Sequence, residues 1–397
     1  MNRNIAVLLA VRVVANFADS FYFLASVWYV KDMTDSSFWV GVTTFVAMVP
    51  VAFQVLYGPL IDCYDKKKLL LWAMAVQATV FTILASLYVI DELSVGVVIV
   101  GLFVATLASE LSYPTEYALV PTLVREADLQ KVNALFTFTY HSLDILCNAI
   151  AGILLALIGV GLVYTSNAIL YLFLFGGIGF LLRINEIKAH TPSDFTYFAD
   201  LQFGFRYVWK LGSFRTLILV FTCLNFMISI SLGVLPILAT TEQEYGLWLA
   251  AISIGTLLGS GLSIRFGVRS LRWTFVLATG FGGVAWCISA FWLNRNFGVA
   301  LICFSMAWVA IGMMGIQFQT LLQRQIEPDY LGRVLTVVYA LQGILAPFGY
   351  LLGGALADWV GHGLLYLVGA VTLLGTSHYF LSNSFLKSSV AIHDQAV

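Results

Sequence analysis

The sequence predicts an all-α integral membrane protein in which twelve transmembrane helices form two six-helix, pseudo-symmetric bundles. Composition is the first observation: of 397 residues, 60% are hydrophobic and only 10% are charged, and the mean hydropathy is +0.91. A soluble protein of this length would carry far more charge on its surface. The second observation is that the apolar residues fall in runs of roughly 20 or more, the length of helix that crosses a bilayer. The runs are continuous rather than alternating with a period of two, which argues against a β-barrel.

These runs divide the chain into twelve expected spans. Arg12 and Asp19 interrupt the first run, and no small-residue cleavage site follows it, so we expect a first helix rather than a signal peptide. The expected spans cover residues 4–30, 37–61, 69–90, 95–118, 132–158, 161–182, 214–240, 245–264, 272–293, 297–321, 334–357 and 361–386.

The basic residues predict the orientation of the chain. If the N-terminus is placed in the cytoplasm, all of the 20 Lys and Arg residues face inward except Arg12, Lys31 and Arg295. Because basic residues near the ends of membrane helices stay on the cytoplasmic side, both termini are expected to be cytoplasmic. The predicted location is a bacterial cytoplasmic membrane, crossed many times by the chain.

The third observation is an internal repeat of about half the chain. GVGLVY at 159–164 matches GHGLLY at 361–366, and EADL at 126–129 corresponds to EPDY at 327–330. The stretch GPLIDCYDKKK, which begins at Gly58, has a weaker counterpart in GLSIRFGVRSL at a similar offset. Such a repeat predicts two six-helix halves of the same orientation, related by an axis along the membrane normal.

The repeat also sets the expected domain boundaries. We place an N-terminal bundle at residues 1–183, a cytoplasmic linker at 184–213 and a C-terminal bundle at 214–397. The second half of the linker reads FADLQFGFRYVWKL and is amphipathic. We expect it to form a helix along the inner membrane surface.

Four stretches carry a resemblance to a known family. GPLIDCYDKKKLL at 58–70 has a Gly, an Asp and then a basic cluster, and a second Asp precedes the basic run. The other stretches are YPTEYALVPTLVREADLQKVNAL at 113–135, LLQRQIEPDYLGRV at 321–334 and GGALADWVG at 353–361. Together with the two parallel halves, they resemble the major facilitator superfamily, and within it the branch of macrolide-efflux proteins and enterobactin-type siderophore exporters. The resemblance implies the fold of that family and secondary transport by alternating access.

The loop after the second span is expected to act as a cytoplasmic gate. In the resembled family the Asp at the position of Asp62 contacts the start of the eleventh helix, where free backbone N–H groups favour a negative charge. Gly58 would permit close helix approach. The alternative is that the charges of this loop only fix the topology. The gate candidates are Gly58, Asp62, Asp65, Lys66, Lys67 and Lys68.

Ionisable residues inside the N-terminal spans are the candidates for substrate binding and proton coupling. A charge at the bilayer centre costs about 2.5–3.5 kcal/mol on insertion scales, so its presence indicates a function. Spacings of three and four residues place them on shared helix faces. The rival explanation is a structural ion pair between Arg12 and Asp19, which would meet only through extended side chains. The candidates are Arg12, Asn16, Asp19, Glu110, Tyr113, His141, Asp144 and Asn148.

The C-terminal spans offer amides and aromatic rings in place of ionisable residues. The resemblance implies a central cavity, whose walls would then be acidic on one side and aromatic and amide-bearing on the other. Such a cavity suits an amphipathic substrate with a cationic or donor-rich group. The candidates from this half are Asn225, Phe226, Gln317, Tyr339 and Gln342.

The predicted function is proton-coupled export of a small amphipathic or cationic solute, such as a drug or a metal-chelating metabolite. No GxxxxGK[ST] loop, nucleophile elbow or metal-binding His pair is found, so we expect no ATP coupling, no catalysis, no metal and no cofactor other than the proton gradient. A formal net charge of −1 gives no reason to expect a nucleic-acid partner, and a monomer suffices. The alternatives are an importer of the same fold and a non-transporting membrane receptor.

Overall fold

The computed structural model describes residues 3–53, 57, 60–61, 64–124, 126–182, 197–210, 212–266, 271–326 and 331–382. These residues form α-helices joined by short turns, without a strand in the described part of the chain. Ten of the described helices are long and apolar enough to cross a membrane. Large apolar side chains remain exposed along them, as at Phe180 and Trp359, which are 84% and 90% exposed. Such surfaces suit contact with lipid, and the predicted all-α membrane fold is confirmed.

The chain divides into two compact units, which are described separately. Unit 1 comprises Met1–Phe195 and Ala239–Leu247, and unit 2 comprises Thr196–Leu238 and Trp248–Val397. The short segment Ala239–Leu247 joins unit 1 through local contacts. The ammonium of Lys31 donates a hydrogen bond to the carbonyl of Ala239 at 2.6 Å.

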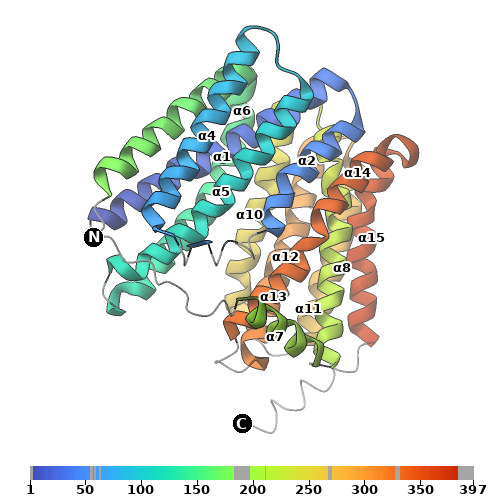
Figure 1. Ribbon diagram of the computed structural model, residues 1–397. Helices are drawn as coiled ribbons and strands as arrows, with labels where there is room; N and C mark the ends of the chain where they lie inside the picture. The colour runs from blue at the N-terminus through green and yellow to red at the C-terminus, as the bar shows by residue number, and fades with distance from the viewer. Residues whose placement is uncertain are drawn as a thin grey trace. The chain divides into compact units, whose positions relative to one another are not determined.

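Unit 1 is a bundle in which α1 packs against α6, and α4 packs against both α5 and α6 (Figure 1). Its centre is aromatic: the ring of Phe81 lies 4.7 Å from that of Tyr22 and is stacked 5.8 Å from that of Tyr171. The helices of unit 1 are α1 (Arg3–Thr34), α2 (Ser37–Ala52), α4 (Lys66–Val89), α5 (Val95–Leu123) and α6 (Glu126–Leu181).

Unit 2 is a second bundle, in which α8 packs against α14 and α15, and α11 against α12 and α15. Its centre is also aromatic, because Trp248, Trp286, Phe304 and Tyr366 form one ring cluster. The helices of unit 2 are α7 (Tyr197–Lys210), α8 (Ser213–Gly233), α9 (Leu235–Leu238), most of α10 (Glu242–Phe266), α11 (Leu271–Trp292), α12 (Phe297–Gln325), α13 (Leu331–Ile344), α14 (Ala346–Val360) and α15 (His362–Ser382).

The internal repeat has a backbone counterpart. Gly159 and Gly361, the first residues of the two matching hexapeptides, have φ values of 75° and 94°. This left-handed region favours glycine, which explains why the repeat keeps glycine at both positions. Gly159 breaks α6 between the two spans expected there, and Gly361 ends α14 before α15.

The last residues of the hexapeptides also have matching environments. Tyr164 and Tyr366 are both fully buried. The hydroxyl of Tyr164 lies 3.1 Å from Oγ of Ser26, and that of Tyr366 lies 2.8 Å from Oγ of Ser289. In each unit the tyrosine therefore ties its helix to another helix of the same unit.

The bounds of several helices differ from the expected spans. The single span expected at 334–357 consists of α13 and α14, which meet at Leu345. Pro347 lies in the first turn of α14, and because proline has no N–H it cannot donate the helical hydrogen bond to the carbonyl of Gly343, one turn earlier. The amphipathic linker segment forms the helix α7 at Tyr197–Lys210.

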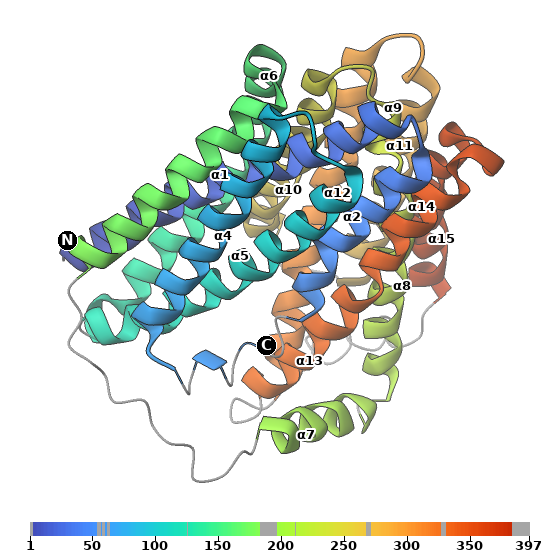
Figure 2. The ribbon, with the colours of Figure 1, turned by 45° about the horizontal axis from the view of Figure 1, so that its top comes forward.

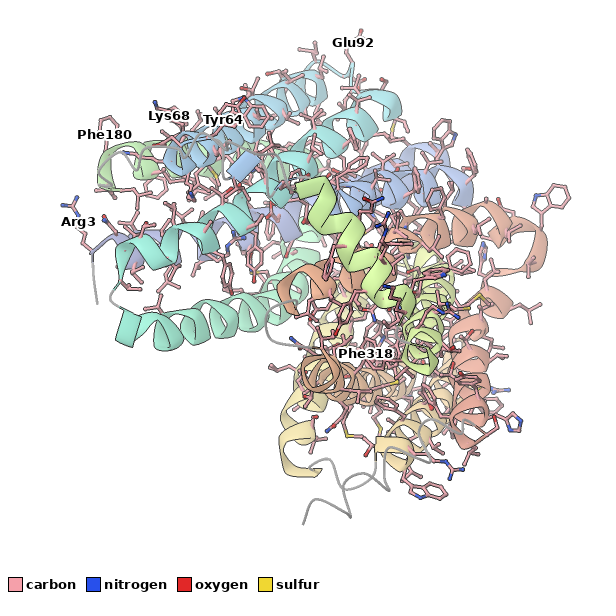
Figure 3. All side chains as sticks on the ribbon, turned by 60° about the horizontal axis from the view of Figure 1, so that its bottom comes forward. Arg3, Tyr64, Lys68, Glu92, Phe180 and Phe318 are labelled. Atoms are coloured by element: carbon pink, nitrogen blue, oxygen red, sulfur yellow. The ribbon has the colours of Figure 1, made fainter. Side chains whose placement is uncertain are left out.

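The ends of unit 1 differ in charge. Figure 3 places Arg3 and Lys68 at one end of this unit, together with Phe180, and Glu92 at the other end. This is the arrangement that alternating crossings require if Arg3 and Lys68 share one side of the membrane.

Small residues let two helices of unit 2 approach closely. A Cβ atom added at Gly259 of α10 would lie 2.0 Å from the carbonyl oxygen of Val309 in α12. Gly255, one turn earlier, would meet the carbonyl of Ser305 at 2.4 Å. Close packing of small residues is a main source of helix association in a bilayer.

We expect Gly259→Ala to destabilise the protein by about 1–3 kcal/mol, because the methyl group forces two backbones apart. Gly261→Ala, in the same helix, is the matched control, because no neighbouring atom lies within 4 Å of a Cβ added at that position. Thermal unfolding of the purified protein in detergent measures both variants. Equal unfolding temperatures for the two would contradict the close contact of α10 and α12.

Candidate functional site

A buried ion pair joins α1 and α5 inside unit 1. Nε of Arg12 donates to Oε2 of Glu116 at 2.9 Å, and the two side chains are only 4% and 0% exposed. Nη1 of Arg12 donates to Oδ1 of Asn16 at 3.4 Å, and the guanidinium lies 4.8 Å from the ring centroid of Tyr113. The pair neutralises two charges that would be expensive in hydrocarbon.

Asp19 lies two turns further along α1 in a different environment. Its Oδ1 accepts a hydrogen bond from the Tyr171 hydroxyl at 2.5 Å, and its Oδ2 accepts one from Ser109 at 2.7 Å. The Tyr22 hydroxyl also hydrogen bonds to this carboxyl. Within the described residues no ion pair joins Asp19 to a basic side chain. Three helices, α1, α5 and α6, therefore contribute hydroxyl partners around one carboxyl group.

The two carboxyl groups differ in what their partners can do. A guanidinium has only donors and keeps its charge, so it holds Glu116 as a carboxylate. A hydroxyl can either donate or accept, so the hydroxyls around Asp19 can partner a carboxylate or a protonated acid. Asp19 is also only partly buried, whereas Glu116 is fully buried. Protonation of Glu116 would leave the Arg12 charge without its partner, whereas protonation of Asp19 would leave no basic side chain unpaired.

Glu110, a further candidate, lies on α5 and is partly buried. It is close enough to interact electrostatically with Tyr22 and Tyr57. Since Tyr22 also contacts Asp19, Glu110 borders the same polar cluster. The candidates His141, Asp144 and Asn148 belong to α6, but their side chains lie outside the described residues.

The candidates of unit 2 lie in two different places. Asn225 of α8 is exposed, and its amide lies 3.5 Å from the carbonyl of Gln342 in α13. Phe226 and Gln342 are partly buried, and Tyr339 is 47% exposed. Gln317 differs because it is buried and donates to Oγ of Ser263 at 2.9 Å, between α12 and α10. Its amide therefore serves helix packing inside the unit.

The gate candidates have local roles where the structure describes them. Asp65 caps the start of α4 by accepting a hydrogen bond from the backbone N–H of Lys68 at 2.8 Å. The ammonium of Lys67 donates to the carbonyls of Gly179 and Leu182 at the end of α6, at 3.1 and 2.7 Å. Lys66 is partly buried. Gly58 and Asp62 lie outside the described residues.

Sequence reasoning missed the partners that complete the cluster. The sequence contains a pattern that could have identified Glu116, because a buried arginine in a membrane helix requires a counter-charge and Glu116 lies one turn from the candidate Tyr113. No pattern singles out Ser109, Tyr22 or Tyr171, because serines and tyrosines are common in these spans. Tyr171 is 152 residues from Asp19 in the chain, and only the packing of α1 on α6 brings them together.

Comparison with known proteins agrees with this architecture. The model of the Major Facilitator Superfamily matches residues 8–349. The chain belongs to this superfamily. It is therefore a multi-pass membrane transporter for small molecules rather than an enzyme, and transporters of this family typically use ion gradients.

The relatives include efflux and siderophore transporters. Macrolide efflux protein A of Streptococcus pyogenes is 23% identical over 383 residues, covering 93% of this chain and 89% of the relative. The staphyloferrin A transporter of Staphylococcus aureus is 21% identical, covering 91% of each chain. The predicted resemblance to the macrolide-efflux and siderophore-exporter branch is thus confirmed.

Solved structures support the fold. The crystal structure of the nucleoside transporter NupG superposes with a TM-score of 0.72 at 13% identity, covering 96% of this chain and 99% of the other. A bacterial homologue of the iron transporter ferroportin, in an inward-facing state, gives 0.67 at 17% identity, with coverages of 96% and 99%.

We expect Arg12→Met and Glu116→Leu each to destabilise the protein by about 3–5 kcal/mol, because removing one partner leaves the other as an unpaired buried charge. The double variant Arg12→Met/Glu116→Leu should lose less than the sum of the single losses. Thermal unfolding in detergent tests this double-mutant cycle. Strictly additive losses would show that the two side chains do not stabilise each other.

Proposed function

We propose that the protein exports a small amphipathic solute against proton entry, with Asp19 as the proton carrier. The observation that carries the proposal is the contrast between Asp19 and Glu116. Glu116 is locked by a guanidinium, while Asp19 is held by hydroxyls that suit both of its protonation states. A transporter driven by protons needs one carboxyl group that can change its charge in place.

The cycle follows from this chemistry. Protonation of Asp19 from the outer side removes its negative charge and weakens the attraction for a cationic or donor-rich solute, which leaves outward. Loss of the proton to the cytoplasm restores the charge and the affinity. Glu110, which borders the cluster, adds to the negative potential that the solute meets.

The solute class rests on both the charges and the relatives. In unit 1 the acidic candidates are Asp19 and Glu110, and in unit 2 the exposed candidates are the amide of Asn225 and the ring of Tyr339. Carboxylates favour a cationic or donor-rich group of a solute, and an aromatic ring favours its apolar part. The names of the relatives indicate a macrolide-like drug or a metal-chelating metabolite.

We expect Asp19→Asn to abolish export while the protein remains folded in the membrane, because the amide cannot exchange a proton. Asp91→Asn is the matched control: Asp91 lies in the exposed turn after α4, and its φ of 59° is a conformation that Asn adopts as readily as Asp. Efflux from cells with equal amounts of each variant is the measurement. Full export by Asp19→Asn would eliminate Asp19 as the proton carrier.

The direction and the cargo are tested together. In cells that lack their main efflux pumps, we expect expression of the protein to deplete one solute inside and enrich it outside, and a proton uncoupler to reverse the change. Intracellular and extracellular metabolites measured by mass spectrometry give the result. A solute that accumulates inside would instead identify an importer of the same fold.

A further inference from the structure

Helix α7 carries a basic and aromatic surface that has no part in the proposed transport mechanism. Within residues 202–210, where the burial of α7 is described, Gly204 and Val208 are buried, and the helix packs against α13. Other side chains of α7 are exposed and line a shallow, open groove of about 370 Å³; they are Phe205, Arg206, Trp209 and Lys210.

The aromatic part of this surface is ordered although it is exposed. The rings of Phe205 and Trp209 are stacked, with centroids 5.4 Å apart and an angle of 13° between their planes. Trp209 is nevertheless 50% exposed and Phe205 is 44% exposed. A stacked pair with this much open apolar surface can cover a further apolar group.

The basic part comes from two helices. Arg206 and Lys210 are one turn apart on α7, and Arg215 comes from the start of α8. The guanidinium of Arg215 lies 5.2 Å from the ring centroid of Trp209, and its Nη1 donates to the carbonyl of Trp209 at 3.3 Å. These contacts hold the end of α7 to α8 and bring a third positive charge to the aromatic pair.

The basic residues of this surface have no acidic partner in the part of the chain that the structure describes. Among the described residues, no carboxylate forms an ion pair with Arg206, Lys210 or Arg215. Three positive charges beside one aromatic pair complement an anion that also has an apolar part. A free anion would match the charges alone and leave the rings exposed.

The position of the surface beside the start of a membrane span favours a lipid headgroup as the anion. The membrane span that contains α8 begins at Phe214, next to Arg215. Figure 2 shows α7 running crosswise to α8 rather than along it, as a helix lying in the plane of a membrane surface would. Phospholipid headgroups occupy this level, where Trp rings and basic side chains are commonly found.

We propose that this surface binds an anionic phospholipid, with Arg206, Lys210 and Arg215 around the headgroup phosphate and the rings of Phe205 and Trp209 against the glycerol and upper acyl chains. The site is separate from the Asp19 cluster. Its failure would leave the proposed export untouched, because binding is measured without substrate.

The test is native mass spectrometry of the full-length protein, titrated with phosphatidylglycerol or with phosphatidylcholine of the same acyl chains. We expect phosphatidylglycerol to be retained preferentially, and Arg206→Gln/Lys210→Gln to lower its apparent affinity at least about fivefold, since phosphate contacts by charged groups are lost. Arg206→Lys/Lys210→Arg, which keeps both charges, should retain most of the binding. Arg3→Gln/Arg295→Gln removes the same net charge elsewhere and should leave the binding unchanged.

Three results would overturn the proposal. One is equal retention of the two lipids by the unchanged protein. Another is an equal loss of phosphatidylglycerol in both charge-removing variants, which would reduce the effect to net charge. The third is displacement of the lipid by millimolar inorganic phosphate, which would identify a site for small anions rather than for a lipid.

Discussion

A polar group in hydrocarbon has to find its partner inside the protein, and most features of this chain follow from that constraint. Many hydroxyls meet it locally: Thr43, Thr106 and Thr279 each donate to the carbonyl four residues earlier in their own helix. Hydrogen bonds of this kind do not determine how neighbouring helices pack against one another. The groups that cannot be satisfied locally, above all Arg12 and Asp19, require partners from other helices and thereby fix how α1 sits against α5 and α6.

The same constraint separates structural from functional charge. A carboxylate bound to a guanidinium is stable and inert, since neither group can change its charge without exposing the other. A carboxyl group among hydroxyls is stable in two states. The two environments lie only about two turns apart along α1, at Arg12 and at Asp19. One helix therefore carries both a charge held in an ion pair and the carboxyl group that we propose to carry the proton.

The sequence predicted the fold well because its signals are local. Length and hydropathy locate the spans, the glycines at 159 and 361 mark the repeat, and amphipathicity identifies α7. Which side chains meet between helices depends on how each helix is rotated about its axis. The spacing of residues along one helix does not determine that rotation. From the sequence, the alternative to a functional role is an ion pair between Arg12 and Asp19 on the same helix, whereas in the structure Arg12 pairs with Glu116 on α5. The break at Leu345 had a visible cause in Pro347, but the apolar run continues through it.

The two halves of the repeat have diverged unequally. Each half has kept a glycine at a position with a positive φ and a buried tyrosine whose hydroxyl lies within hydrogen-bond distance of a serine on another helix. The buried charges described here belong to one half alone. After a gene duplication, such a division lets selection act on the copies separately. Under the proposed mechanism, mutations in the copy without buried charges alter which cargo is accepted, while the copy that carries Asp19, the proposed proton carrier, keeps the coupling to the proton gradient. Descendants of one ancestor can in this way acquire new cargoes without having to evolve a new site of energy coupling.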